Sequence, residues 1–153
     1  MQNQRRSVLK KMAATLAGIT GINAIAKAAA PALPDATPQG EVIYDQDVPL
    51  FSSFRIHGNT VYVAGIGAHF EGDIKAHTDH VLIEMEKVLI KAGSSMNKVL
   101  KVSVFLHDLN DYKAMNEVYK GRFGSNPPVR TTVAVYGGVP GDSLVEMDCI
   151  AML

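Results

Sequence analysis

The sequence predicts an α+β fold in which a mixed β-sheet carries two helices on one of its faces. Three observations support this prediction. The expected elements follow the order strand, strand, helix, strand, helix, strand, strand; each helical segment has a single apolar stripe; and the central strand alternates apolar and polar residues. With 153 residues, 47% of them hydrophobic, the chain is long enough for one domain with a single packed core.

The first 28 residues are predicted to be an export signal. A basic start is followed by the apolar segment MAATLAGITGINAIA and by small residues that fit an A-x-A cleavage pattern. The sequence RRSVLK resembles a twin-arginine signal, so we expect a periplasmic protein that leaves the membrane after cleavage. An ordinary secretory signal or an uncleaved anchor is the alternative. Residues 29–40, which contain three prolines, are expected to be a linker, and residues 41–153 a single domain.

The first two strands are predicted to form a hairpin. The segments FSSFRI and TVYVAG are rich in β-branched and aromatic residues, and His57-Gly58-Asn59 lies between them. Gly58 and Asn59 suit the positive φ angles of a tight hairpin turn.

Two segments have the apolar spacing of amphipathic helices. The first covers residues 76–92 and is expected to end at Gly93. The second covers residues 111–123, with Asn110 as its cap and Gly124 as its stop. The first stripe consists of Val81, Met85, Val88 and Ala92, flanked by Leu82 and Leu89, and the second of Tyr112, Met115, Tyr119 and Phe123.

Three further strands complete the sheet. In residues 98–107 apolar side chains alternate with Lys101 and Ser103, which is typical of a strand covered on one side. Residues 130–136 and 144–152 form the closing strands, joined by GGVPGDS. With both helices on one face, the other face of the sheet is either an oligomer interface or a solvated polar surface.

Arg130 and Glu146 are the candidate charged residues of a site. Arg130 shares a strand face with Thr132, and a guanidinium beside Pro127-Pro128 is suited to binding a carboxylate, although a solvated outer face is the simpler interpretation. If the closing strands pair directly, Glu146 lies about 13 Å along the strand from Arg130, too far for a direct ion pair. Either the pairing differs, or the two charges meet through a ligand or across a subunit interface.

Two other classes of function are disfavoured. After residue 30 the chain has ten basic and fifteen acidic residues, so nucleic acid is not an expected partner. His77 and His80 have the spacing of two metal ligands on one helix turn, but no third ligand is evident and a solvated helix face is favoured. The residues alone therefore predict no metal site.

Two motifs in order and spacing resemble the Rid family of imine and enamine deaminases, also called YjgF proteins. They are PVRTTV at residues 128–133 and VEMDCIA at residues 145–151, and the similarity extends over residues 42–153. The resemblance implies a chorismate-mutase-like fold and a homotrimeric barrel with ligand pockets between subunits. It also implies that Arg130 binds the carboxylate of a 2-imino or 2-enamino acid and that Glu146 positions the water that releases ammonia. No metal or organic cofactor is implied. By family alignment, Asn116 and Thr132 lie near the pocket.

Three departures from the family pattern fall in the expected pocket. Phe51 replaces a frequent tyrosine, Ala64-Gly65-Ile66 replaces Ser-Gly-Gln, and Thr132 replaces a frequent cysteine. Two hydroxyl groups are therefore missing, and we expect a larger or more apolar substrate, or a lower rate. The alternative is a non-catalytic trimer that binds small carboxylates or acts like a chaperone.

Overall fold

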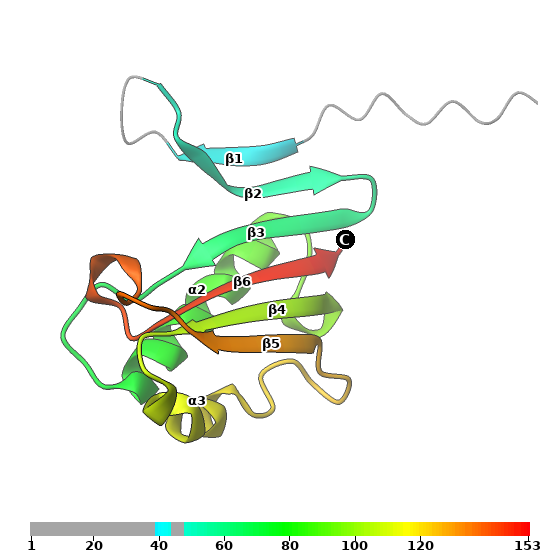
Figure 1. Ribbon diagram of the computed structural model, residues 1–153. Coiled ribbons are helices and arrows are strands. Elements are labelled where there is room, and N and C mark those ends of the chain that lie inside the picture. The colour runs from blue at the N-terminus through cyan, green and yellow to red at the C-terminus, as the bar shows by residue number, and fades with distance from the viewer. Residues whose placement is uncertain (1–38, 44–47) are drawn as a thin grey trace, which may run out of the picture. The chain divides into compact units, whose positions relative to one another are not determined.

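The computed structural model describes residues 39–43 and 48–153 (Figure 1). The expected export signal, at residues 1–28, and most of the expected linker lie outside the described residues. Strand β1 (Gln39–Ile43) occupies the last two residues of that linker and had not been predicted. In the part of the chain that the structure describes, no helix is long and apolar enough to cross a membrane.

The strands form one mixed sheet in the order β1-β2-β3-β6-β4-β5. β2 (Phe51–His57) and β3 (Thr60–Ile66) form the predicted hairpin, and Gly58 in its turn has a φ of +57°. β4 (Val99–Leu106) lies between β5 (Val129–Ala134) and β6 (Val145–Met152), as Figure 1 shows. All neighbouring strands are antiparallel except β4 and β5, which are parallel.

Helices α2 (Ile74–Lys91) and α3 (Tyr112–Tyr119) lie on one face of the sheet, as predicted (Figure 1). α2 begins two residues before the predicted start because the Asp73 carboxylate accepts the Ala76 N–H at 2.8 Å and caps the helix. Gly93, with a φ of +85°, follows its last turn as predicted.

The predicted bounds of the second helix were wrong at both ends. A short 3-10 helix (Leu109–Asp111) precedes α3, and Asp108 caps it by accepting the Asn110 N–H at 2.8 Å. α3 ends at Tyr119 because Lys120 leaves the helical region with a ψ of 127°. Phe123 still packs in the core through the turn that follows.

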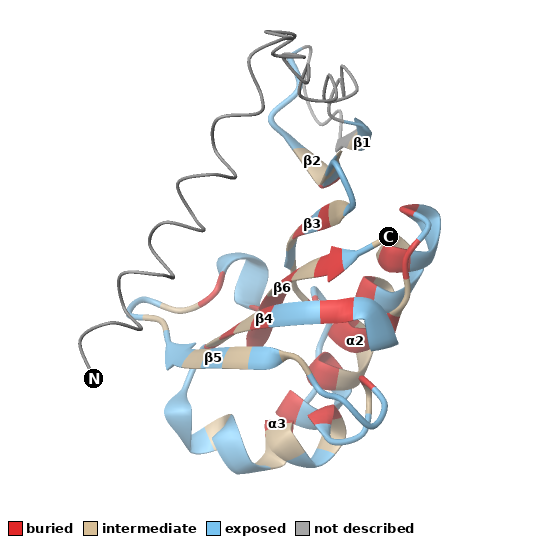
Figure 2. Ribbon diagram, turned by 90° about the vertical axis from the view of Figure 1, so that its right-hand side faces the viewer, coloured by how far each residue is buried: buried red, intermediate tan, exposed pale blue. Residues whose placement is uncertain are grey.

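The core lies between the helices and the sheet, where Figure 2 shows the buried residues. It is built from one face of each central strand together with the inner side of α2. These residues are Val102, Val104 and Leu106 on β4, Val145, Met147, Cys149 and Ala151 on β6, and Val81, Leu82, Met85 and Leu89 on α2. Burial raises the pKa of the Cys149 thiol to about 12.

The other face of the sheet is covered by none of the described elements. In the registers of β4 with its neighbours, Val133 lies beside Phe105, and Val129 beside Lys101. Val129 is 70% exposed and Val133 is 44% exposed. We call this side, represented by Tyr62, Phe105, Val129, Val133 and Ile150, the open face of the sheet. Lys101, Ser103 and Asp148 lie on the same side, so this face presents both apolar and polar side chains, and the oligomer interface remains a prediction.

Candidate functional site

Arg130 lies on the helix-covered face of the sheet. It pairs in register with Val102, which is fully buried beneath the helices, and residues opposite one another in a ladder point to the same face. The Arg130 side chain therefore extends toward α3 and away from the open face. The apolar side chains of β5, at Val129 and Val133, occupy the open face instead.

Aromatic groups of α3 hold the Arg130 guanidinium. Its Nη2 donates a hydrogen bond to the Tyr112 hydroxyl at 3.2 Å, and its Cζ lies 4.6 Å from the ring centroid of Tyr119 and 5.7 Å from that of Tyr112. The four ion pairs found among the described residues all involve other side chains. Within the described part of the chain, this cation is held by neutral groups.

Two further predicted residues lie around this arginine. Thr132 follows it on the same face of β5, and Asn116 stands on α3 at helical spacing from both Tyr112 and Tyr119. The Thr132 Oγ1 and the Tyr119 hydroxyl are buried and have no hydrogen-bond partner within the described residues. Burial raises the pKa of Tyr119 to about 12, a shift that the nearby Arg130 charge only partly opposes, so the phenol is neutral at physiological pH.

Glu146 lies on the open face, with Gly65 against its side chain. It pairs with Phe105 of β4, while its neighbours Val145 and Met147 point into the core. The β3–β6 register shifts between Val63 and Ile66, and this irregularity brings Gly65 so close that a Cβ there would collide with the Glu146 carboxylate. Ala64 precedes Gly65 and is half-buried.

One chain does not bring Arg130 and Glu146 together. β4 separates the closing strands, so the sequence-based possibility that they pair directly is wrong. Arg130 is level with Cys149, three residues from Glu146, and the two charged side chains point to opposite faces of the sheet. The predicted site residues therefore form two separate groups, with Arg130, Thr132 and Asn116 on one side and Glu146, Ala64 and Gly65 on the other.

Phe51 lies on β2, which is two strands from β6 in the sheet. It is the first residue of β2, where it pairs with Ile43 of β1, and it is 48% exposed. The expected pocket residue Phe51 is therefore a partly exposed aromatic ring near the sheet edge.

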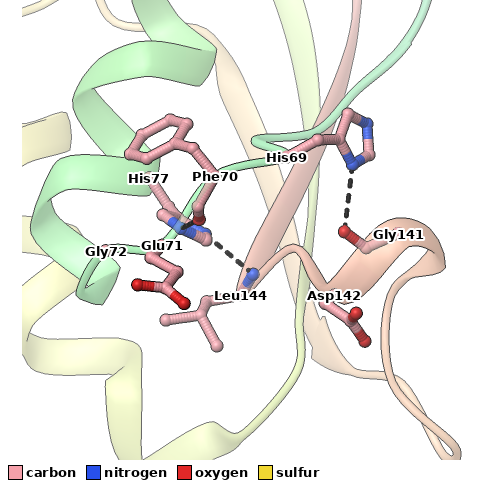
Figure 3. Close-up of a pocket in the computed structure, with 8 residues that line it drawn as sticks. All are labelled: His69, Phe70, Glu71, Gly72, His77, Gly141, Asp142 and Leu144. Carbon is pink, nitrogen blue, oxygen red and sulfur yellow. Dashed lines mark hydrogen bonds between the residues drawn. The ribbon is translucent and has the colours of Figure 1, made fainter.

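A hollow lies beside the Glu146 strand, where the loop before α2 meets the loop before β6 (Figure 3). Its volume is about 550 Å³, and its walls include His69, Phe70, Glu71, His77 and Asp142. His77 is 2% exposed, so the expectation of a solvated helix face was wrong for this residue. A signal was present in the sequence, because position 77 falls one turn before Val81 on the apolar stripe.

Comparisons with known proteins place this fold in one family. Residues 47–153 match the family model described as Endoribonuclease L-PSP. A RutC family protein of Pyrococcus abyssi is 40% identical over 122 residues, which cover 72% of this chain and 95% of that protein. A solved Rid-family protein of unknown function from Yersinia pestis has a TM-score of 0.64 at 29% identity, covering 67% of this chain and 87% of that one. A Mycobacterium tuberculosis member of the YjgF/YER057c/UK114 family has a TM-score of 0.62 at 28% identity, covering 67% and 86% respectively.

Proposed function

Because the chain belongs to the Endoribonuclease L-PSP family, with RutC and YjgF proteins among its relatives, we propose that it hydrolyses reactive 2-imino and 2-enamino acids to 2-keto acids and ammonia. Arg130 binds the substrate carboxylate, and Glu146 positions the attacking water. The protein acts as a homotrimer whose sites lie between subunits, and the substrate is larger or more apolar than the smallest 2-imino acids.

The observation that carries this proposal is the setting of Arg130. A half-buried guanidinium that is held by two tyrosine rings and one hydroxyl, with no carboxylate partner among the described residues, is a prepared receptor for an anion. Its planar fork of donors matches the two oxygens of a carboxylate. A 2-imino acid has this carboxylate next to the electrophilic carbon, so binding the anion also orients the reacting atom.

The opposite orientation of Arg130 and Glu146 supports a site shared between subunits. If both charges contact one small substrate, the Glu146 group must come from a neighbouring chain that packs against the edge strand β5. The apolar side chains of the open face provide the surface for such packing, because Val129 and Val133 lie on β5 itself. A monomer would then bind carboxylates weakly and would not catalyse the reaction.

The proposed chemistry requires only orientation and a proton acceptor. The Glu146 carboxylate takes a proton from water as the oxygen adds to the C=N carbon, giving a carbinolamine. Glu146 gives this proton to the nitrogen; the hydroxyl proton then moves to the nitrogen through the same carboxylate, the C–N bond breaks, and ammonia leaves as the carbonyl of the 2-keto acid forms. A 2-enamino acid enters this sequence after it has tautomerised to the 2-imino acid, by gaining a proton on carbon and losing one from nitrogen. Every atom comes from the substrate and one water molecule.

A non-catalytic carboxylate-binding protein is the second candidate. It is favoured by the loss of two hydroxyl groups from the expected pocket, at Phe51 and Ala64. RNA cleavage, which the name of the family model suggests, is disfavoured by the excess of acidic residues after residue 30.

An assay with 2-imino acids generated in situ distinguishes the deaminase from the non-catalytic carboxylate-binding protein. An L-amino-acid oxidase supplies 2-imino acids from small, branched and aromatic amino acids, and loss of the imine is followed with and without the protein. The Arg130→Ala variant is expected to lower kcat/KM at least about 100-fold, because a bidentate clamp comprises two charge-assisted hydrogen bonds. Lys120→Ala, which removes an exposed charge at the end of α3, is the matched control. If the wild-type protein accelerates no imine but binds 2-keto acids through Arg130, the non-catalytic function is correct.

A further inference from the structure

We propose that His77 is a positioning residue for Glu146. Its neutral ring, protonated at Nε2, ties the loop before α2 to the start of β6 and so fixes the place of the Glu146 carboxylate. The inference rests on the function proposed above, because it assigns His77 a task in that reaction.

The hydrogen bonds of the ring define its protonation. The Leu144 N–H donates to Nδ1 at 3.1 Å, so Nδ1 must be without a proton to accept this bond. Nε2 lies 2.8 Å from the carbonyl oxygen of Phe70, which can only accept, so Nε2 must carry the proton. Figure 3 shows His77 between these two partners.

The imidazole that makes these two bonds is itself packed inside the protein. His77 is almost fully buried, and the Phe70 ring packs against it with the centroids 4.8 Å apart. Removing the imidazole leaves the Leu144 N–H and the Phe70 carbonyl, which are both in partly buried hydrogen bonds, without this partner.

We call the pair of hydrogen bonds made by His77 a tie between the two segments, and Ser143 makes a second tie next to it. The Ser143 hydroxyl accepts the Ala68 N–H at 2.9 Å and donates to the Val145 carbonyl at 2.6 Å, and Ser143 is fully buried. Residues 68–70 and 143–145 are therefore joined at two points.

Both ties lie close in sequence to the contact between Glu146 and Gly65. Glu146 directly follows Val145, and Gly65 precedes Ala68 by three residues. A shift between the two segments would change the register irregularity of β3 and β6, in which the Glu146 carboxylate lies against Gly65. His77 thus acts on the carboxylate through Leu144 and does not contact the substrate itself.

Kinetics of the full-length His77→Leu and His77→Gln variants test whether His77 positions the Glu146 carboxylate. His77→Leu is expected to lower kcat by about tenfold or more, because misplacing a reacting group by about 1 Å costs on the order of 100-fold. KM should change by less than about twofold, since the substrate carboxylate is bound by Arg130, which His77 does not contact. The amide of glutamine has an acceptor oxygen and a donor nitrogen, so His77→Gln should recover most of the lost kcat.

His80→Leu is the matched control. His80 is on the same helix and packs edge-on against the same Phe70 ring at 5.2 Å, but it takes no part in either tie. This variant is expected to keep wild-type kcat. Wild-type kcat for His77→Leu, or a glutamine variant no better than the leucine variant, would overturn the positioning task.

Nitrogen-15 NMR of the wild-type imidazole tests the tie without reference to catalysis. We expect the shifts of the Nε2–H form at neutral pH, and slow hydrogen exchange of the Leu144 amide that becomes faster in His77→Leu. A ring protonated at Nδ1 would overturn the inference even in an active protein. If the ties are present and no imine is hydrolysed, the proposed reaction fails, and with it the task of His77 in that reaction.

Discussion

Replacing Gly65 with alanine is expected to displace the Glu146 carboxylate without unfolding the protein. A Cβ at position 65 collides with Oε1 of Glu146 and lies 2.8 Å from its Cδ. These atoms are the free end of a flexible side chain, so the carboxylate can rotate away while the backbone stays in place. Gly65 is not among the residues with a positive φ, so alanine adds no backbone strain.

The expected effect of Gly65→Ala on kcat is much larger than its expected effect on the free energy of unfolding. A carboxylate displaced by about 1 Å loses on the order of 100-fold in kcat, which corresponds to about 2.7 kcal/mol in the activation barrier. The free energy of unfolding should change by less than about 1 kcal/mol, because alanine also reduces the entropy of the unfolded chain. Imine turnover and urea unfolding of the same preparations measure the two quantities.

A double-mutant cycle provides the control. In a Glu146→Ala background the new methyl group meets no carboxylate, so Gly65→Ala should cause no additional loss of activity. Losses that add in the double variant would show that Gly65 acts independently of Glu146. Unchanged kcat in the single variant would refute the assignment of the water-positioning task to this carboxylate.

Three further predictions concern the Tyr112 hydroxyl, the pH dependence of stability and the open face of the sheet. Tyr112→Phe removes the hydroxyl that accepts from Arg130 while keeping the ring, so we expect KM for 2-imino acids to rise several-fold at constant kcat. The raised pKa values of Cys149 and Tyr119 mean that the folded protein retains protons that the unfolded chain releases above about pH 9 and pH 10 respectively. These two groups therefore add no pH dependence to the stability below about pH 9, and in urea unfolding their contribution falls by up to about 1.4 kcal/mol per pH unit per group from there to about pH 12. The Cys149→Ala/Tyr119→Phe variant, which lacks both groups, is the control and should lose less stability over the same pH range. Val133→Asp places a charge on the open face and should convert the oligomer to monomers by light scattering, and a wild-type protein that is already monomeric would contradict the shared site.

The elements that were predicted correctly have local signals. The Gly58-Asn59 turn, the stripe of α2 and the alternation of β4 each depend on residues within a few positions of one another. β1 was missed because it is a short edge strand that begins within a proline-rich segment. The end of α3 was placed at Phe123 because the stripe continues there in sequence, although the backbone has already left the helix at Lys120.

The arrangement of the site could not be predicted in the same way. Both closing strands have one apolar face and one face with a charge, and the pattern alone suggests that the apolar faces share a side. On β6 the apolar face lies in the core, whereas on β5 it is the open face, because α3 provides tyrosine rings for Arg130. That outcome depends on a contact between residues far apart in sequence, and so does the burial of His77.

The position of β6 has a consequence for the order of folding. β6 follows the five other strands in sequence, yet it lies between β3 and β4 in the sheet. During synthesis, the β1–β2–β3 ladder and the parallel β4–β5 pair can form before β6 emerges, but nothing yet joins them into one sheet. Residues 145–152 close the sheet and add Glu146 in the same step, so an incompletely synthesised chain displays two unpaired inner strand edges that a chaperone could bind.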